Sequence, residues 1–431
     1  MTFEQLFDNR GRMRISDGMR YYKKTDEQNN MPRFVVEMNE PVDCDCLNRA
    51  AQKALERHRV FRMTVVSDSA EFFLTTNDQE PLVHPENGER HVVGTEANHG
   101  YLTWIGYRDH QIMVEFFHGV SDGMGVIAFV KTLLYHYCCE KYGTFEVPEG
   151  VLTSAIPEDP CEYADSLLFT PEEPAVPGVR YEYEKAFQLP DEQMKSPISC
   201  RYYELTLDAP AFEDCMRRNR SSRSALFAWM MNRTIARVNG QAAEPIVAAL
   251  AVNARVAYGA QSTEQCCVAT IPLWYDAELA ELSDAEQCEK TREMIVEGTK
   301  PHNIIAGAQR TKQFNERLSE RYPTLLEKQA FACMVNKQGG IKYTYGLSYI
   351  GEVTYGAGID EHVQASYAVL CANTIPVILE IAKCRDHYHI SYCTHLENDP
   401  YVWKLREAFE KAGISCTCVQ KEDFIETLAC F

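Results

Sequence analysis

The sequence has no apolar run that approaches the roughly 20 residues needed to cross a bilayer. Its start, Met1–Asp8, also lacks the charged and then apolar layout of a secretory signal. We therefore expect a cytoplasmic protein that has no membrane span.

Positive charge is scarce as well. The chain has 43 Lys and Arg residues against 62 Asp and Glu residues, which gives a formal net charge of -19 and an isoelectric point near 5.1. Proteins that bind nucleic acids or anionic membranes need the opposite balance. The composition argues against these two partner classes, but not against an anionic cosubstrate held by a local basic patch.

Cysteine is abundant, at 17 residues, but metal-binding spacing is missing. The cysteines are scattered or adjacent, as at Cys138-Cys139 and Cys266-Cys267, and none forms the two-residue-spaced pairs or the Cys/His sets of a zinc site. In a reducing compartment such residues act as small apolar side chains. We predict neither a metal site nor a permanently bound cofactor.

The remaining composition is that of a globular protein, with 45% hydrophobic and 24% charged residues. A chain of 431 residues usually divides into more than one domain. Prolines are dense between Ile156 and Gly178, where they favour an extended connection. The sequence thus predicts a half at 1–155, a linker at 156–180 and a second half at 181–431.

Helix-like and strand-like patterns alternate in both halves, which predicts a mixed α/β or α+β architecture. We expect helices near 43–58, 122–141, 210–220, 222–236, 284–299, 311–322 and 400–413, and strands near 61–66, 71–75, 101–107, 111–117, 202–207, 245–252, 268–274, 343–349, 366–372, 374–382 and 387–393.

One motif joins a strand pattern to a helical pattern. It is His118-Gly119-Val120-Ser121-Asp122-Gly123. A Ser-His-Asp triad is disfavoured because residues three and four apart in one tight loop cannot form that relay without unusual folding. A metal site would need a second histidine or carboxylate. A lone general base at His118 and a satisfied structural histidine at a strand end both stay open.

With this motif the chain resembles the condensation-domain-like acyltransferases. That group includes chloramphenicol acetyltransferase, peptide-synthetase condensation domains and alcohol acetyltransferases. His118–Gly123 carries the resemblance, and Ala54–Arg62 and Val252–Arg255 support it. It spans essentially the whole chain in length and in the order of elements, and it is closest to alcohol acetyltransferase-like members.

The resemblance implies two chloramphenicol-acetyltransferase-like halves that form a V, with a tunnel between them. It implies that His118 deprotonates the acceptor hydroxyl or amine, which then attacks an acyl thioester. Asp122, followed by Gly123, would support the loop by pairing with an arginine. Arg62 is the first candidate for this partner and Arg255 the second.

The chain departs from the family in two places. Phe117 stands where many condensation domains have the first of two histidines, and the Asp-Phe-Gly-Trp-Gly signature of plant acyltransferases is absent. At a comparable place stands Tyr345–Gly351, in which Ser348 could donate a hydrogen bond to the tetrahedral oxyanion. A strand residue that faces away from the chemistry is the alternative for Ser348.

Arginines gather densely at one place in this acidic chain. They could contact the phosphates of coenzyme A or of a phosphopantetheine arm, or form a solvated helix end. These residues are Arg217, Arg218, Arg220 and Arg223.

The sequence as a whole predicts an acyltransferase of the His-x-x-x-Asp type that uses a thioester donor and a small hydroxyl or amine acceptor. Acyl-coenzyme A is the expected cosubstrate because no carrier domain is attached. An acyl carrier protein as partner, in a condensation or ester-forming reaction, is the alternative donor. A binding protein that keeps the fold without turnover is the alternative from another class.

Overall fold

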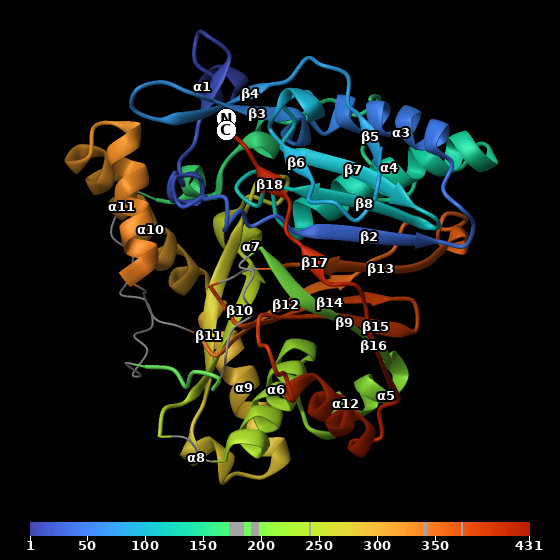
Figure 1. Cartoon of the computed structure of the whole chain (residues 1–431), viewed down its shortest axis with the longest axis vertical. Helices are drawn as coiled ribbons and strands as arrows, with labels where there is room; N and C mark the ends of the chain where they lie inside the picture. Colours follow the sequence, from blue (N-terminus) through green and yellow to red (C-terminus); the bar gives the residue numbers. More distant parts are fainter. Residues whose placement is uncertain (172–184, 191–197, 241–242, 339–342, 372–373) are drawn as a thin grey trace.

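The computed structural model describes residues 1–171, 185–190, 198–240, 243–338, 343–371 and 374–431. The chain folds into two lobes stacked along its long axis, with the blue and cyan residues in the first lobe and most green to red residues in the second (Figure 1). Each lobe has a sheet with helices on its outer side, so that each sheet turns one face toward the other lobe (Figure 1).

The sheet of the first lobe has five strands in the order β13-β2-β8-β7-β5. Two helices that pack against each other cover it. The first of them starts at the predicted N-cap, since the Asp43 carboxylate accepts a hydrogen bond from Cys46 N at 2.9 Å. The elements are β2 (Arg33–Met38), β5 (Val83–Pro85), β7 (Thr103–Arg108), β8 (Gln111–Phe116), β13 (Val363–Val369), α3 (Cys44–Arg57) and α4 (Gly123–Tyr142).

Smaller elements complete this lobe. A three-stranded sheet has the order β1-β4-β3, and the C-terminal strand β18 pairs with β6. The bounds are α1 (Phe3–Leu6), β1 (Arg12–Arg14), α2 (Met19–Tyr22), β3 (Met63–Ser67), β4 (Phe72–Thr76), β6 (Val92–Val93) and β18 (Leu428–Ala429), with 3-10 helices at Arg59–Arg62, Glu96–Asn98 and Asp360–His362.

The second lobe is built on an eight-stranded sheet, in the order β11-β10-β12-β14-β15-β9-β16 with β17 added to β9. Its outer face packs on α5, α6, α9 and α12 (Figure 1). The strands are β9 (Ser199–Asp208), β10 (Ile246–Asn253), β11 (Val268–Tyr275), β12 (Tyr345–Glu352), β14 (Val377–Cys384), β15 (His387–Thr394), β16 (Cys416–Gln420) and β17 (Phe424–Ile425). The helices are α5 (Ala209–Arg218), α6 (Arg223–Asn239), α7 (Arg255–Tyr258), α8 (Ala277–Ala280), α9 (Asp284–Gly298), α10 (Pro301–Arg321), α11 (Leu325–Gln338) and α12 (Tyr401–Lys411).

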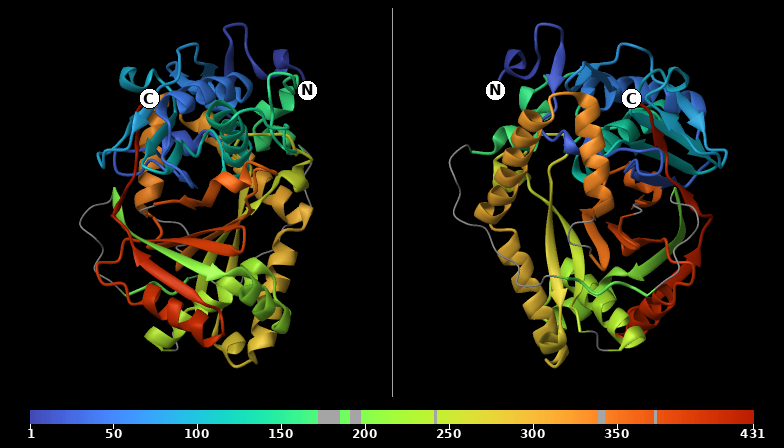
Figure 2. Two further views of the ribbon diagram at one scale, coloured as in Figure 1. Left: turned by 90° about the vertical axis from the view of Figure 1, so that its right-hand side faces the viewer. Right: turned by 60° about the vertical axis from the view of Figure 1, so that its left-hand side comes forward.

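The second half of the chain contributes to both lobes. Strand β13 lies antiparallel to β2 in the first lobe, with Ala368 opposite Phe34, and α11 packs against α2. Figure 2 shows the long helices at one side of the molecule, alongside both lobes. The predicted boundary between 1–155 and 181–431 therefore needs correction, because strand β13 and helix α11 of the second half belong to the first lobe.

The predicted linker is only partly an extended connection. Two 3-10 helices, Pro160–Tyr163 and Ser166–Phe169, interrupt it. Glu162 is buried there and binds the Arg57 guanidinium through two hydrogen bonds of 2.7 Å, which fixes this segment to α3. Residues 172–180 of the predicted linker lie outside the described residues.

Among the residues described, no helix combines the length and the apolar character that crossing a bilayer requires.

Candidate active site

His118 lies in the turn that follows β8. Its backbone N–H donates to the Asn30 carbonyl at 3.0 Å, and Val120 N donates to the Phe117 carbonyl at 2.8 Å. The ring nitrogen Nδ1 is 2.9 Å from the carbonyl oxygen of Ser121. Because a carbonyl only accepts, Nδ1 carries the hydrogen in the neutral ring and Nε2 keeps its lone pair. The backbone thus selects the tautomer that a general base at Nε2 requires.

A cavity of about 290 Å³ between the lobes contains His118. The first lobe supplies His118, Arg20 and Asn30, and the second supplies small and polar side chains from three neighbouring strands. The latter include Ala249 and Ala251 of β10, Gly346 and Ser348 of β12, and Ile378 and Glu380 of β14. The imidazole therefore shares an interlobe space large enough for the reacting ends of two small molecules.

The surroundings of His118 keep its ring neutral. Burial lowers its pKa below 6.5, and the nearby Arg20 guanidinium lowers it further, against the opposing charge of Asp122. A neutral imidazole can accept a proton at physiological pH, whereas an imidazolium cannot.

Asp122 pairs with Arg255 across the interlobe boundary. The two guanidinium nitrogens Nη1 and Nη2 each lie 2.9 Å from a carboxylate oxygen. The same carboxylate accepts from Met124 N and Gly125 N at 3.0 Å, as the N-cap of α4, and from Cys267 N at 2.7 Å. Burial alone would raise the pKa of Asp122, but Arg255 and these backbone hydrogen bonds hold it below 3.8. Asp122 is therefore an ionised structural group whose oxygens are all occupied.

Arg62, the first candidate for the partner of Asp122, does not pair with it, so this prediction was wrong. Its Nε donates to the Asn77 carbonyl at 3.0 Å, within the first lobe. Arg255, the second candidate, holds the loop. The Ser121 hydroxyl donates to the Glu264 carbonyl at 2.6 Å and is not in a position to act as a nucleophile activated by His118.

The glycines after Asp122 permit a close approach of α4 to the second lobe. A Cβ added at Gly125 would lie 2.2 Å from the carbonyl oxygen of Glu264, and one at Gly123 would lie 3.0 Å from Ile350 Cγ2. Gly125 therefore admits no side chain without a backbone shift, and Gly123 packs tightly on β12.

Ser348 lies in the same cavity as His118 and is paired there with Glu380. The two residues are opposite each other on the parallel strands β12 and β14 and line the same cavity, so that the Ser348 hydroxyl is a neighbour that lowers the pKa of the Glu380 carboxyl group. Burial raises the pKa of Glu380 to about 7, although Ser348 and His118 both act to lower it. Glu380 was not predicted as a site residue; its signal in the sequence is one acidic residue inside the apolar run of β14.

No family model matches the sequence, and no curated protein matches it either. The structure, in contrast, matches solved structures over nearly its whole length. The first condensation domain of the calcium-dependent antibiotic synthetase, solved with a substrate analogue, aligns over 92% of this chain and 95% of its own, with a TM-score of 0.59 and 12% identity. The fold is that of the condensation domains.

Two further solved structures have this condensation-domain fold. The trichothecene 15-O-acetyltransferase from Fusarium sporotrichioides is 10% identical, with a TM-score of 0.57 over 93% of this chain and 94% of its own. The epimerization domain from the third module of tyrocidine synthetase B is 13% identical, with a TM-score of 0.56 over 93% and 96%. The expected two-lobed α/β architecture is therefore confirmed.

The predicted arginine cluster does not belong to the interlobe site of this condensation-domain fold. Arg217 pairs with Asp214, Arg218 donates to the Ala412 carbonyl, and Arg223 binds Glu213 and the Tyr388 hydroxyl. The end of α5 and the start of α6 lie on the outer side of the second lobe (Figure 1). None of the four arginines, Arg217, Arg218, Arg220 and Arg223, lines the cavity of His118. The prediction that these arginines bind the phosphates of the donor was therefore wrong. The alternative, a solvated helix end, describes the cluster.

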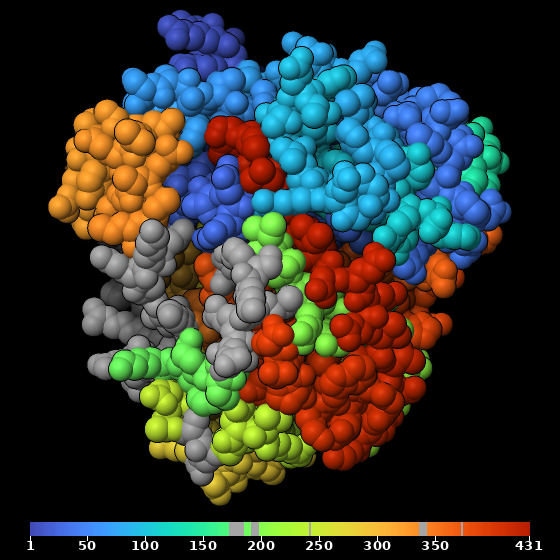
Figure 3. Space-filling model, in the orientation of Figure 1, coloured from blue at the N-terminus to red at the C-terminus, as the bar shows by residue number. Residues whose placement is uncertain are grey.

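Cations gather instead at a second cavity, of about 790 Å³, which we call the α2–α10 mouth. It is lined by Arg20, Lys23, Lys24 and Arg310, and it shares Arg20, Gln28 and Asn30 with the cavity of His118. Figure 3 shows the dark-blue segment before β2 beside the orange helices on this face. Within the described ranges, Lys23, Lys24 and Arg310 have no carboxylate within ion-pair distance, whereas Arg20 binds Asp17 at 2.9 Å. In an acidic protein this mouth is locally positive.

One buried cluster has the residue types of a metal site. The ligand atoms of Glu86, His91 and Glu115 lie within 4.8 Å of one another. Arg33 binds both carboxylates, and the carboxylates raise the pKa of His91 to about 9 against the opposing effect of burial. The positive charges of Arg33 and protonated His91 thus balance the negative charges of Glu86 and Glu115. We interpret the cluster as an ion-pair network that also holds the C-terminal segment through the Thr427 hydroxyl.

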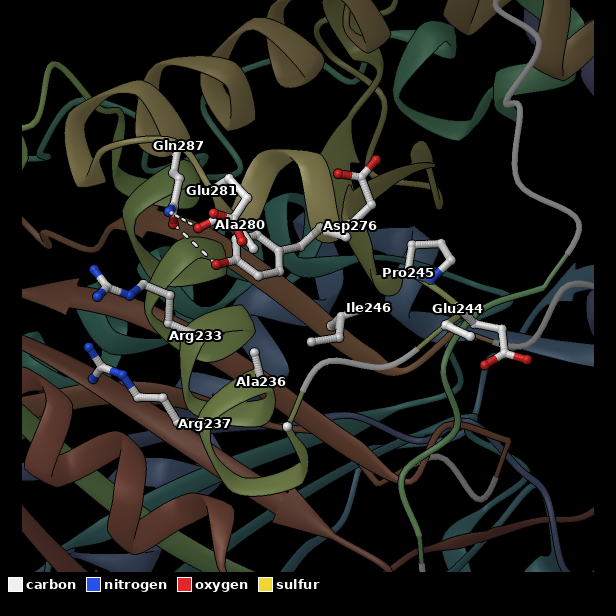
Figure 4. A pocket seen from close by; sticks show the side chains of 14 residues that line it. Arg233, Ala236, Arg237, Glu244, Pro245, Ile246, Asp276, Ala280, Glu281 and Gln287 are labelled. Carbon is white, nitrogen blue, oxygen red and sulfur yellow. Dashed lines mark hydrogen bonds between the residues drawn. The ribbon is translucent and has the colours of Figure 1, made fainter.

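A further cavity, of about 300 Å³, lies at the far end of the second lobe. Figure 4 shows Arg233 and Arg237 on one side of it and the carboxylates of Glu244 and Asp276 on the other. Among its described lining residues there is no histidine, cysteine or serine, so it offers neither an imidazole base nor a serine or cysteine nucleophile.

Proposed function

We propose that this protein transfers an acyl group from a thioester to a hydroxyl or amine acceptor, with His118 as the general base. The observation that carries the proposal is the free Nε2 of His118, in a ring held by the Ser121 carbonyl, inside an interlobe cavity that also contains the Ser348 hydroxyl. The condensation-domain fold supports it.

The reaction needs no covalent enzyme intermediate. Nε2 takes the proton of the acceptor as its oxygen or nitrogen bonds to the thioester carbonyl carbon, and the carbonyl oxygen becomes an oxyanion. Ser348 is the hydroxyl of this cavity that we assign as donor to this oxyanion. When the intermediate collapses, the carbon–sulfur bond breaks and the imidazolium returns the proton to the leaving thiolate.

The α2–α10 mouth is the proposed entrance for the donor. Coenzyme A and a carrier-bound phosphopantetheine arm both carry phosphate beside the pantetheine that bears the thioester. Lys and Arg side chains bind phosphate through charge-assisted hydrogen bonds. Acyl-coenzyme A is the donor we propose, and the acyl-carrier thioester of a condensation or ester-forming reaction is the competing one.

The decisive experiment is acceptor-dependent thiol release. Acetyl- and longer acyl-coenzyme A, and the same acyl groups on phosphopantetheinylated carrier protein, are assayed against a panel of alcohols and amines, with product ester or amide detected by mass. Release that requires both donor and acceptor supports transfer. Binding of the thioester with no release from either donor class would instead favour a protein that keeps the fold and has lost turnover.

Removal of charge from the mouth is expected to raise KM for acyl-coenzyme A. In the triple variant Lys23→Gln, Lys24→Gln and Arg310→Gln we expect KM to increase by about 10- to 100-fold for each hydrogen bond to phosphate that the variant removes, since a charge-assisted hydrogen bond is worth roughly 1.5–3 kcal/mol. The rate at saturating donor should change little. Steady-state kinetics measure both, and Arg217→Gln, at the rejected cluster, is the matched control. An unchanged KM in the triple variant would exclude this entrance.

A further inference from the structure

Glu380 is a buried carboxyl group of the interlobe cavity to which the proposed reaction gives no role. It lies on the second-lobe wall that faces His118, and only 8% of the residue is exposed. Within the described part of the chain no lysine, arginine or histidine is within 4.0 Å of its carboxylate. A buried carboxylate without a cation is costly, so the group has a reason to hold a proton.

Its neighbours form a row across the inner face of the sheet. Ser348 of β12, Glu380 of β14, Ser391 of β15 and Glu204 of β9 are successive cross-strand partners. This row contains two carboxylates. Glu204 forms an ion pair with Lys421 at 2.9 Å, whereas Glu380 has no charged partner among the described residues.

The other titratable groups near Glu380 come from both lobes. Around the cavity these are His118, Arg20 and Glu426. Arg20 is paired with Asp17, and the Glu426 carboxylate accepts hydrogen bonds from the backbone N–H groups of residues 29–31. On β15, His389 belongs to the same face and lies near Glu204 rather than Glu380. Among the described lining residues, His118 and Glu380 are therefore the titratable groups held neither by an ion pair nor by backbone N–H donors.

The Ser348 hydroxyl has a single hydrogen, and Glu380 decides where it points. An ionised carboxylate only accepts, so it takes that hydrogen and leaves the cavity with a lone pair. A protonated carboxyl group donates to the Ser348 oxygen, which frees the serine hydrogen for another acceptor and polarises it. Ser348 is thus an oxyanion donor only while Glu380 carries a proton.

We propose that Glu380 is a positioning residue that, in its protonated form, turns the Ser348 hydroxyl hydrogen toward the carbonyl oxygen of the bound thioester. This rests on the proposed acyl transfer, since it assigns the oxyanion donor of that reaction. Glu380 does not contact the reacting atoms in this scheme, and no bond of the enzyme is made or broken.

The consequence is a rate that falls on both sides of neutrality. Below the lowered pKa of His118 the base becomes protonated. Above about pH 7, the value to which burial raises the pKa of Glu380, the carboxyl group ionises and captures the serine hydrogen. Activity is therefore expected to fall by up to tenfold per pH unit on the alkaline side, toward the rate without the oxyanion donor.

The first test is the pH profile of thiol release in the full chain. Glu380→Gln keeps a neutral donor to Ser348, because its amide N–H can replace the acid O–H, and should remove the alkaline limb while retaining activity. Ser348→Ala should lower the rate at neutral pH, and adding Glu380→Gln to it should change nothing more. Glu352→Gln, at the exposed end of β12, is the control that should keep the wild-type profile. An alkaline limb that persists in Glu380→Gln would overturn the proposal.

The second test needs no turnover, so that it separates this proposal from the proposed function. The infrared difference spectrum between wild type and Glu380→Gln reports the carboxylic acid carbonyl of this one residue. It should be present at pH 6 and titrate away with a midpoint near 7. Because the Ser348 hydrogen bond lowers the pKa of Glu380, Ser348→Ala should move the midpoint upward. A carboxylate already ionised at pH 6, or a midpoint that Ser348→Ala leaves in place, would contradict the coupling even if no donor is ever turned over.

Discussion

Replacement of His118 by alanine is expected to lower kcat for acyl transfer by about 10²–10⁴-fold, the range that a positioned general base contributes. The acceptor would then have to lose its proton without a positioned base. KM for the donor should stay near its wild-type value, because His118 is not among the residues that line the α2–α10 mouth. Thiol release from acyl-coenzyme A across the acceptor panel measures both constants.

The matched control is His387→Ala, which removes an exposed histidine at the start of β15 and should leave kcat unchanged. The melting temperature of His118→Ala should stay close to that of wild type, since its ring makes one side-chain hydrogen bond, to the Ser121 carbonyl, and one weak interaction with Cys266. If wild type and His118→Ala release thiol at the same rate across the panel, His118 is not the base for those substrates.

The motif around His118 could be predicted because its features are local. A strand that ends at Phe116, a turn, and an N-cap at Asp122 are all encoded within about a dozen residues, and the structure has them in that order. The free Nε2 follows from a carbonyl only three residues away. Local hydrogen bonds and hydrophobic periodicity are what a sequence shows most directly.

The partners of this motif could not be predicted, because they are distant in sequence. Arg255 lies 133 residues from Asp122, and Arg62 was the first candidate until the fold placed it against the Asn77 carbonyl. Glu380 lies beside Ser348 only because β12 and β14 are neighbours in the sheet. Three cations of the α2–α10 mouth, Arg20, Lys23 and Lys24, are close together in the sequence, but the fourth, Arg310, is nearly 300 residues away.

Helix α11 was not predicted, and strand β13 was predicted without its place in the fold, for different physical reasons. Helix α11 has no apolar stripe, since apolar and polar side chains alternate around it from Leu325 onward, and periodicity therefore gives no signal. Strand β13 was expected as a strand, but its membership in the first lobe depends on pairing with β2, more than 300 residues earlier. Strand pairing over such separations is decided by tertiary packing.

Replacement of Asp122 by alanine is expected to destabilise the fold by about 3–5 kcal/mol, since it leaves the buried Arg255 guanidinium without its counterion. It also removes the N-cap of α4 and leaves Cys267 N without its acceptor. Activity should fall together with stability.

This stabilisation depends on pH. Because the native pKa of Asp122 is below 3.8, the stabilisation of the fold by ionised Asp122 is complete above pH 3.8 and is lost as the pH falls through the native pKa. The difference in unfolding free energy between wild type and variant should therefore shrink in strong acid.

Denaturant unfolding at pH 7 and at pH 3 measures this difference. Arg406→Ala, which breaks the exposed pair with Glu410 on α12, is the control and should change the unfolding free energy little, since exposed pairs are screened by water. The double variant Asp122→Ala, Arg255→Leu should recover part of the lost unfolding free energy, because it removes the unpaired charge that causes the loss.

Normal stability of Asp122→Ala would exclude the structural role of Asp122. If both single variants were destabilised and the double variant recovered nothing, the backbone hydrogen bonds of Asp122 and Arg255 would account for the loss instead of their mutual attraction. The pair would then act as a set of caps for two loops rather than as an ion pair that joins the lobes.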